Sequence, residues 1–194
     1  MPGATLKVDK VGASDAGKRS FWRAMAATNP ILHQAGVIAY RIRAGRVEVL
    51  LMTSRDTGRW IIPKGNIAAG TAPWKAAAKE AYEEAGVKGR IGGSIPLGIY
   101  TYLKKLDSGE PRPAAVEVYL LRVDQSLKKW PEWRERKLCW VSPETAVGLI
   151  AEPGMMPLLR RLMEFEDDLA EPATAFAKRP HAKAGAGPRR KKGG

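Results

Sequence analysis

The sequence is nearly free of cysteine and has no long apolar run. Its single cysteine, Cys139, cannot form an intramolecular disulfide or build a cysteine-rich metal site. No apolar run approaches the roughly 20 residues that would span a bilayer, and the N-terminus lacks the apolar centre of a secretory signal. Neither His33 nor His181 has a neighbour that suggests catalysis. We therefore expect a protein of the reducing cytoplasm with no membrane partner.

Positive charge is abundant and unevenly placed. Lys and Arg number 33 against 20 Asp and Glu, which gives a net charge of +13, and residues 178–194 carry seven basic and no acidic side chains. The 194 residues, 44% of them apolar, suffice for one core of ordinary size. We predict a loosely ordered arm at 1–33, one domain at 34–170 and a basic disordered tail at 171–194. Such a tail would attract nucleic acid non-specifically.

Alternating runs of strand-like and helical sequence predict an α/β fold. A short helix at 19–27 would precede the domain. Thr71 and Gly86 would begin and end a mid-chain helix, Ser142 would cap another, and 155–169 reads as an amphipathic helix. The segment 104–113 is expected to be a turn. The strand-like runs are 36–42, 46–53, 60–62, 97–103, 115–123 and 136–141. Together they indicate a mixed sheet with flanking helices.

Three glutamates stand close together on the mid-chain helix. Glu80, Glu83 and Glu84 occupy positions i, i+3 and i+4, which places their carboxylates within about one helical turn. Like charges so close repel one another. Either divalent cations such as Mg²⁺ or Mn²⁺ offset that repulsion, or neighbouring basic side chains and solvent do. The glutamates alone favour the second possibility, because Glu is common on exposed helix faces.

The residues around these glutamates change that balance. Gly65 stands 15 residues before Glu80, in a loop where the missing side chain lets backbone groups approach a phosphate or metal. The stretch from Gly65 to Val87 resembles the signature of the Nudix hydrolases, with Gly65, Glu80, Glu83, Glu84, Gly86 and Val87 in register. Thr71, Lys79 and Ala81 depart from it. Further similarity to the diphosphoinositol polyphosphate phosphohydrolase branch extends over about 34–168.

The resemblance implies a Nudix-like α/β/α sandwich and a metal-dependent hydrolase that cleaves a diphosphate linkage. It makes Glu80 and Glu84 ligands of Mg²⁺ or Mn²⁺, with Gly65 in the metal-binding loop. Glu83 would be a further ligand or the catalytic base, and the sequence does not separate these roles. Glu117, in a strand-like run, could add a carboxylate or simply face solvent.

Several basic and hydroxyl side chains could hold a phosphorylated substrate. Ser54, which could donate its hydroxyl, and Arg55 follow the second strand, and Arg55 matches a phosphate-contacting stretch of the diphosphoinositol branch. Lys64 lies beside Gly65, while Arg41 and Arg112 lie near predicted turns. Each of these cations could instead be merely solvated.

Three substrate classes and one different function remain open. Diphosphoinositol polyphosphates, dinucleoside polyphosphates and a 5′-diphosphorylated or 5′-triphosphorylated end of RNA would all need the same carboxylates. Alternatively, the chain is a nucleic-acid-binding protein with a Nudix-like scaffold, and the basic tail supports this possibility. The intact glutamates favour the hydrolase, because a binding module has no need of them.

Overall fold

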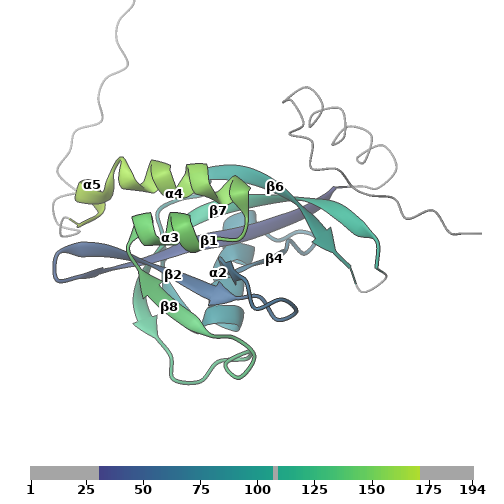
Figure 1. The fold of residues 1–194 in the computed structure, drawn as a ribbon, viewed down its shortest axis with the longest axis horizontal. Coiled ribbons are helices and arrows are strands. Elements are labelled where there is room, and N and C mark those ends of the chain that lie inside the picture. The colour runs from purple at the N-terminus through teal and green to yellow at the C-terminus, as the bar shows by residue number, and fades with distance from the viewer. Residues whose placement is uncertain (1–30, 107–108, 171–194) are drawn as a thin grey trace, which may run out of the picture.

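The computed structural model describes residues 31–106 and 109–170 (Figure 1). The predicted arm, the short helix at 19–27 and the basic tail lie outside these residues, apart from the last residues of the arm. The elements in chain order are β1 (Leu32–Arg43), β2 (Arg46–Thr53), β3 (Trp60–Ile61), β4 (Lys64–Asn66), α2 (Pro73–Ala85), β5 (Val87–Ile91), β6 (Gly98–Lys105), β7 (Pro111–Ser126), β8 (Leu138–Val141), α3 (Pro143–Leu149), the 3₁₀ turn η1 (Pro153–Met155), α4 (Met156–Met163) and α5 (Glu166–Ala170).

The strands form one mixed sheet, as the sequence predicts. Its main order is β3-β2-β1-β7-β5, with β4 beside β1, β6 beside β7 and β8 beside β2. β1 and β7 run parallel, and all other pairs are antiparallel. The hairpin between β1 and β2 turns at Ala44 and Gly45, both with positive φ. Two such residues match the right-handed twist of the paired strands.

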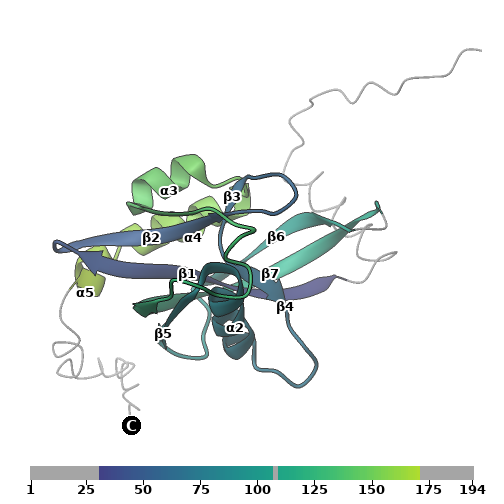
Figure 2. The ribbon, with the colours of Figure 1, turned by 90° about the horizontal axis from the view of Figure 1, so that it is seen from below.

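Helices cover both faces of the sheet, which makes the domain an α/β/α sandwich (Figures 1 and 2). On one face, alanines of α2 pack against β1, β2 and β7. On the other face, α3, η1 and α4 bury a second cluster that includes Leu159 and Leu162. No helix among the described residues is long and apolar enough to cross a membrane.

The helix around the glutamates begins differently from the prediction. Ala72 is its N-cap residue and no side chain caps the free N–H groups, so the predicted Thr71 cap is wrong. Thr71 lies one residue too early, and its N–H closes a turn onto Ala68 O at 3.0 Å. Pro73 stands in the first turn and Gly86 ends the helix with φ 62°, as predicted.

Three other predictions of local structure need correction. Residues 155–169 do not form one helix, because a tight turn in which Phe165 N donates to Leu162 O separates α4 from α5. Residues 64–66, which the sequence places in a loop, are strand β4 and pair with β1. The turn predicted over 104–113 is shorter, because β6 and β7 extend into it. Ser142 caps α3 as predicted, accepting from Thr145 N at 3.2 Å.

Candidate functional site

The site begins where helix α2 crosses strand β4. Ala77, Ala81 and Ala85 are fully or almost fully buried under α2, and their small side chains let the helix lie close to the sheet. Gly65 faces this helix, and a Cβ there would collide with the carboxylate of Glu80. A glycine is therefore required for Glu80 to occupy this position. Burial raises the pKa of Glu80, partly offset by the nearby Lys79.

Glu84 lies one turn further along the same face and is almost completely buried. Its Oε1 forms an ion pair with Arg136, and its Oε2 accepts the backbone N–H of Lys64 at 2.8 Å. Burial raises the pKa of Glu84 to about 7 even though Arg136 favours the charged form. Glu84 is thus held from two sides, by strand β4, which carries Gly65, and by the segment before β8.

Glu83 differs from the other two glutamates, because it lies at the outer edge of the helix. Its Oε2 is 2.5 Å from Lys79 Nζ in an exposed i, i+4 ion pair, an arrangement that contributes little to stability. Its backbone carbonyl accepts the N–H of Glu132 at 3.1 Å, which ties the helix to the loop before β8. The three carboxylates share a single helical turn, but only Glu80 and Glu84 point inward.

Arg136 joins the separate parts of the site. Its side chain is only 4% exposed and, besides Glu84, it donates to Glu132 Oε2 at 2.7 Å and to Thr53 O at 3.1 Å. A guanidinium can serve all three acceptors at once because its five N–H groups form a planar fork. Sequence reasoning missed this role, since Arg136 stands where a charged loop meets the strand-like run 136–141, and its partners in the structure are not marked by any local pattern.

Lys64 does not point into solvent as a phosphate-binding lysine would. Its ammonium is 2.9 Å from Glu152 Oε1, and both side chains are buried. Tyr100 donates its hydroxyl to the other oxygen of Glu152 at 2.6 Å, and the Tyr102 ring lies beneath the ammonium. Lys64 therefore anchors β4 from the sheet face opposite Glu80.

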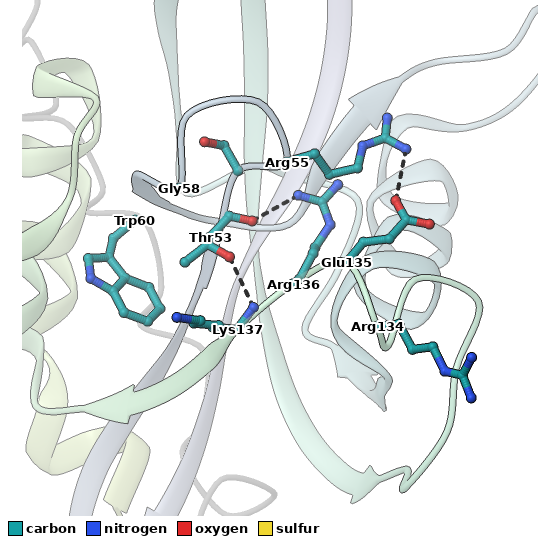
Figure 3. Close-up of a pocket in the computed structure, with 9 residues that line it drawn as sticks. Thr53, Arg55, Gly58, Trp60, Arg134, Glu135, Arg136 and Lys137 are labelled. Atoms are coloured by element: carbon teal, nitrogen blue, oxygen red, sulfur yellow. Dashed lines mark hydrogen bonds and ion pairs between the residues drawn. The ribbon is translucent and has the colours of Figure 1, made fainter.

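A cavity of about 420 Å³ opens beside Arg136 (Figure 3). Ser54 and Arg55, both predicted to bind substrate, line it. Arg55 is paired with Glu132 and Glu135 at 3.6 and 3.4 Å and remains more than half exposed. The other residues that line the cavity are Thr53, Gly58, Trp60, Arg134, Glu135, Arg136 and Lys137. Basic side chains outnumber the single carboxylate, so the cavity suits an anion.

Arg41 and Arg112, also predicted to bind substrate, do not line this cavity. Arg41 is paired with Glu48 at 2.7 Å and its guanidinium stacks on Trp140. Arg112 lies in β7 opposite Lys104 of β6.

Glu117, predicted as an extra carboxylate, lies on the same sheet face as Gly65. Gly65 pairs with Ala35 and Ala35 with Glu117 across adjacent strands. The separation of Gly65 and Glu117 is therefore about 10 Å. The Tyr119 hydroxyl donates to Glu117 Oε2 at 2.7 Å.

The carboxylate oxygens of the site are the ligands that a hard divalent cation prefers. Because Gly65 has no side chain, the Glu80 carboxylate has the space that a Cβ would otherwise fill. Within 31–106 and 109–170, however, no three His, Cys, Asp or Glu side chains converge on one point as metal ligands do. Glu83 and Glu84 are instead paired with Lys79 and Arg136. Cation binding would require these two carboxylates to exchange partners.

Comparisons with known proteins place the chain beside phosphohydrolases. A family model described as NUDIX domain matches residues 32–162. Nudix hydrolase 12, mitochondrial, from Arabidopsis thaliana is 29% identical over 63% of this chain and 62% of its own length. Diphosphoinositol polyphosphate phosphohydrolase 2 from Rattus norvegicus is 32% identical over 60% of this chain and 62% of its own length. The chain thus spans less than two thirds of these two relatives.

A solved structure agrees with the fold. The crystal structure of a C. elegans Ap4A hydrolase binary complex aligns with a TM-score of 0.54 and 26% identity, over 70% of this chain and 97% of that one.

Proposed function

This chain belongs to the NUDIX domain family, and from that membership we propose that it is a metal-dependent hydrolase. Its reaction is the cleavage of a diphosphate linkage in a highly phosphorylated small molecule. The substrate is either a diphosphoinositol polyphosphate or a dinucleoside polyphosphate. The names of the rat relative and of the C. elegans enzyme support these two classes.

One observation carries the proposal. Two inward-facing carboxylates lie next to a basic cavity: Glu80, for which Gly65 makes room, and Glu84, which is paired with Arg136 of the cavity wall. The carboxylates carry negative charge, whereas the basic side chains of the cavity attract negatively charged groups. Hydrolysis of a diphosphate linkage can use both, because the cavity would hold the phosphates and the carboxylates would hold the divalent ion that assists the attack of water.

The carboxylates would serve the reacting phosphate. Glu80 and Glu84 are the ligands we assign to Mg²⁺ or Mn²⁺, and the loop at Gly65 adjoins them. A bound divalent ion supplies positive charge at the phosphate and lowers the pKa of the attacking water. Glu83 would act as a further ligand or accept the proton of that water. Glu117 lies on the same face of the sheet and could supply an additional carboxylate to the metal ion.

The cavity would hold the phosphates that do not react. Arg55 remains exposed despite its two carboxylate neighbours, so its guanidinium can turn toward an anion. Ser54 shares a 2.6 Å hydrogen bond with Thr57, which fixes the short loop that carries Arg55. Because these groups grip phosphate away from the scissile bond, they would bind ground state and transition state alike.

The test is hydrolysis by the full chain, with Mg²⁺ or Mn²⁺, of a diphosphoinositol polyphosphate, a dinucleoside tetraphosphate and a 5′-triphosphorylated RNA. We expect hydrolysis of at least one of the first two, and its loss in Glu84→Gln, which keeps the shape of the side chain. Glu144→Gln is the matched control, because Glu144 lies in the first turn of α3, remote from the site.

Two results would contradict the proposal. Glu84→Gln with wild-type turnover would remove Glu84 from the site. A folded wild-type protein that hydrolyses none of the three substrates, yet binds RNA, would favour the scaffold alternative.

A further inference from the structure

A row of residues leads from the carboxylates across the sheet to its edge. Gly65 of β4 is opposite Ala35 of β1, Ala35 is opposite Glu117 of β7, and Glu117 is opposite Ile99 of β6. Residues directly opposite one another in neighbouring strands project to the same face. Ala35 is packed with the alanines of α2, so the whole row belongs to the α2 face.

The β6 end of this row is apolar and exposed. Ile99 is 60% exposed and Leu103 is 41% exposed, and Thr101 between them is exposed as well. Tyr100 and Tyr102 alternate with them and point to the opposite face, toward the α4 side. Figure 2 shows the β6–β7 hairpin reaching beyond the end of α2. Large aliphatic side chains therefore continue the sheet face on which Glu80 lies.

The two sides of the carboxylates differ in charge, because one side is basic and the other is uncharged. Arg55, Arg134 and Lys137 border the cavity next to Glu84. On the other side, Ile99, Thr101 and Leu103 bring no charge, and Lys105 follows six residues after Ile99, about 20 Å along the strand. Three strand spacings, about 14 Å, separate Gly65 from Ile99. A substrate that fits both sides has a polyanionic part and, a short distance away, an uncharged apolar part.

We infer that Ile99, Thr101 and Leu103 form the surface on which the base of a nucleoside polyphosphate lies, and that the substrate is therefore of the dinucleoside polyphosphate class. The inference rests on the proposed function and selects between its two substrate classes. A purine has two flat apolar faces, which bury exposed aliphatic carbon, while its phosphate chain extends past Glu117 to the carboxylates and the basic cavity. An inositol polyphosphate carries phosphate around its whole ring and would place anionic groups against this uncharged surface.

The test compares two probes that share a phosphate chain and differ in the base, namely diadenosine tetraphosphate and inorganic tetraphosphate. The variant is Ile99→Thr with Leu103→Thr, because threonine removes apolar surface while keeping a residue that strands favour. We expect KM for diadenosine tetraphosphate to rise about tenfold, the scale of the lost apolar contact. The inhibition constant of inorganic tetraphosphate should change less than twofold.

Leu149→Thr is the matched control. Leu149 is 40% exposed and lies at the end of α3, which covers the opposite face of the sheet, so neither constant should change. A double variant that weakens both probes equally, or neither, would overturn the inference. So would wild-type protein that prefers a diphosphoinositol polyphosphate to diadenosine tetraphosphate.

Two further outcomes distinguish a base-binding surface from a dimer interface and from a protein that is no hydrolase. If the wild-type protein hydrolyses neither substrate, the proposed function fails, but calorimetric titration of both probes still tests the base-binding surface. If the double variant changes the sedimentation coefficient from that of a dimer to that of a monomer and leaves the binding of both probes unchanged, the surface is covered by a second copy of the chain and the inference is wrong.

Discussion

Lys64 donates its backbone N–H to Glu84 Oε2 at 2.8 Å, while its side chain extends to the opposite face of the sheet and meets Glu152 Oε1 at 2.9 Å. One residue thus links a carboxylate of the candidate site to the segment that precedes η1. Because strand β4 has only three residues, its own ladder hydrogen bonds constrain it weakly. The buried ion pair therefore contributes to holding β4 against α2.

Replacing Lys64 by Met should destabilise the protein by about 3–5 kcal/mol, because it leaves Glu152 buried without its cation. The double variant Lys64→Met with Glu152→Gln should recover a large part of that loss, since no buried charge is then unpaired. Urea unfolding followed by fluorescence measures both. A double variant as unstable as the single one would show that Lys64 matters for its packing and not for its charge.

Gly65→Ala should abolish hydrolysis while changing the free energy of unfolding by about 1 kcal/mol or less. The new methyl group would meet the end of the Glu80 side chain and not the backbone, so the carboxylate can move away at small cost in stability. Turnover and thermal midpoint are measured together. Gly92→Ala is the matched control, because a Cβ at Gly92 has open space around it, and it should keep full activity.

The sequence marks Gly65 and Glu80 as candidate site residues 15 positions apart, whereas their direct contact became visible only in the structure. The α/β class and the hairpin at Ala44 and Gly45 could be predicted too, because turn residues and apolar runs act locally. Predictions failed for Thr71 and for the unbroken C-terminal helix. In both cases the apolar periodicity correctly indicated a helix, but a proline or a local turn determined where the helix begins or ends.

The roles of Arg136, Glu152 and Lys64 could not be predicted, and the reason is physical. Their partners lie far away along the chain, as in the bond between Arg136 and Glu84, 52 residues apart. A charged residue in a loop reads as solvated unless the fold buries it beside an opposite charge. The sequence leaves open whether Lys64 binds a phosphate or is merely solvated, and in the structure its ammonium is instead paired with Glu152.

Arg136→Met should lower stability by about 3–5 kcal/mol, because Glu84 and Glu132 lose their buried cation and the carbonyl of Thr53 loses a donor. Hydrolysis should also fall steeply, since Glu84 is no longer oriented. Guanidinium chloride unfolding and turnover check the two effects. Arg134→Met provides the control, because Arg134 is exposed in the same loop and stacks on Trp133. A loss of stability as large in Arg134→Met would attribute the effect to the loop.

The difference in stability between wild type and Tyr100→Phe should depend on pH and thereby report on the polar network around Glu152. Burial and the nearby Glu152 raise the pKa of Tyr100 well above its usual value near 10. Above pH 10 the unfolded chain releases the phenolic proton and the folded protein keeps it, so the contribution of this tyrosine to stability is complete below pH 10 and declines as pH rises further.

At pH 7 the Phe variant should therefore be less stable than wild type by about 1–3 kcal/mol, because it lacks the hydrogen bond to the carboxylate. Between pH 10 and 11 that difference should shrink by up to about 1.4 kcal/mol. Chemical unfolding of both proteins at pH 7, 9, 10 and 11 measures the difference directly, and changes common to both, such as lysine deprotonation, cancel. A difference that stays constant to pH 11 would mean that Tyr100 loses its proton in the folded protein as easily as in the unfolded chain, and that its hydroxyl is not held by Glu152.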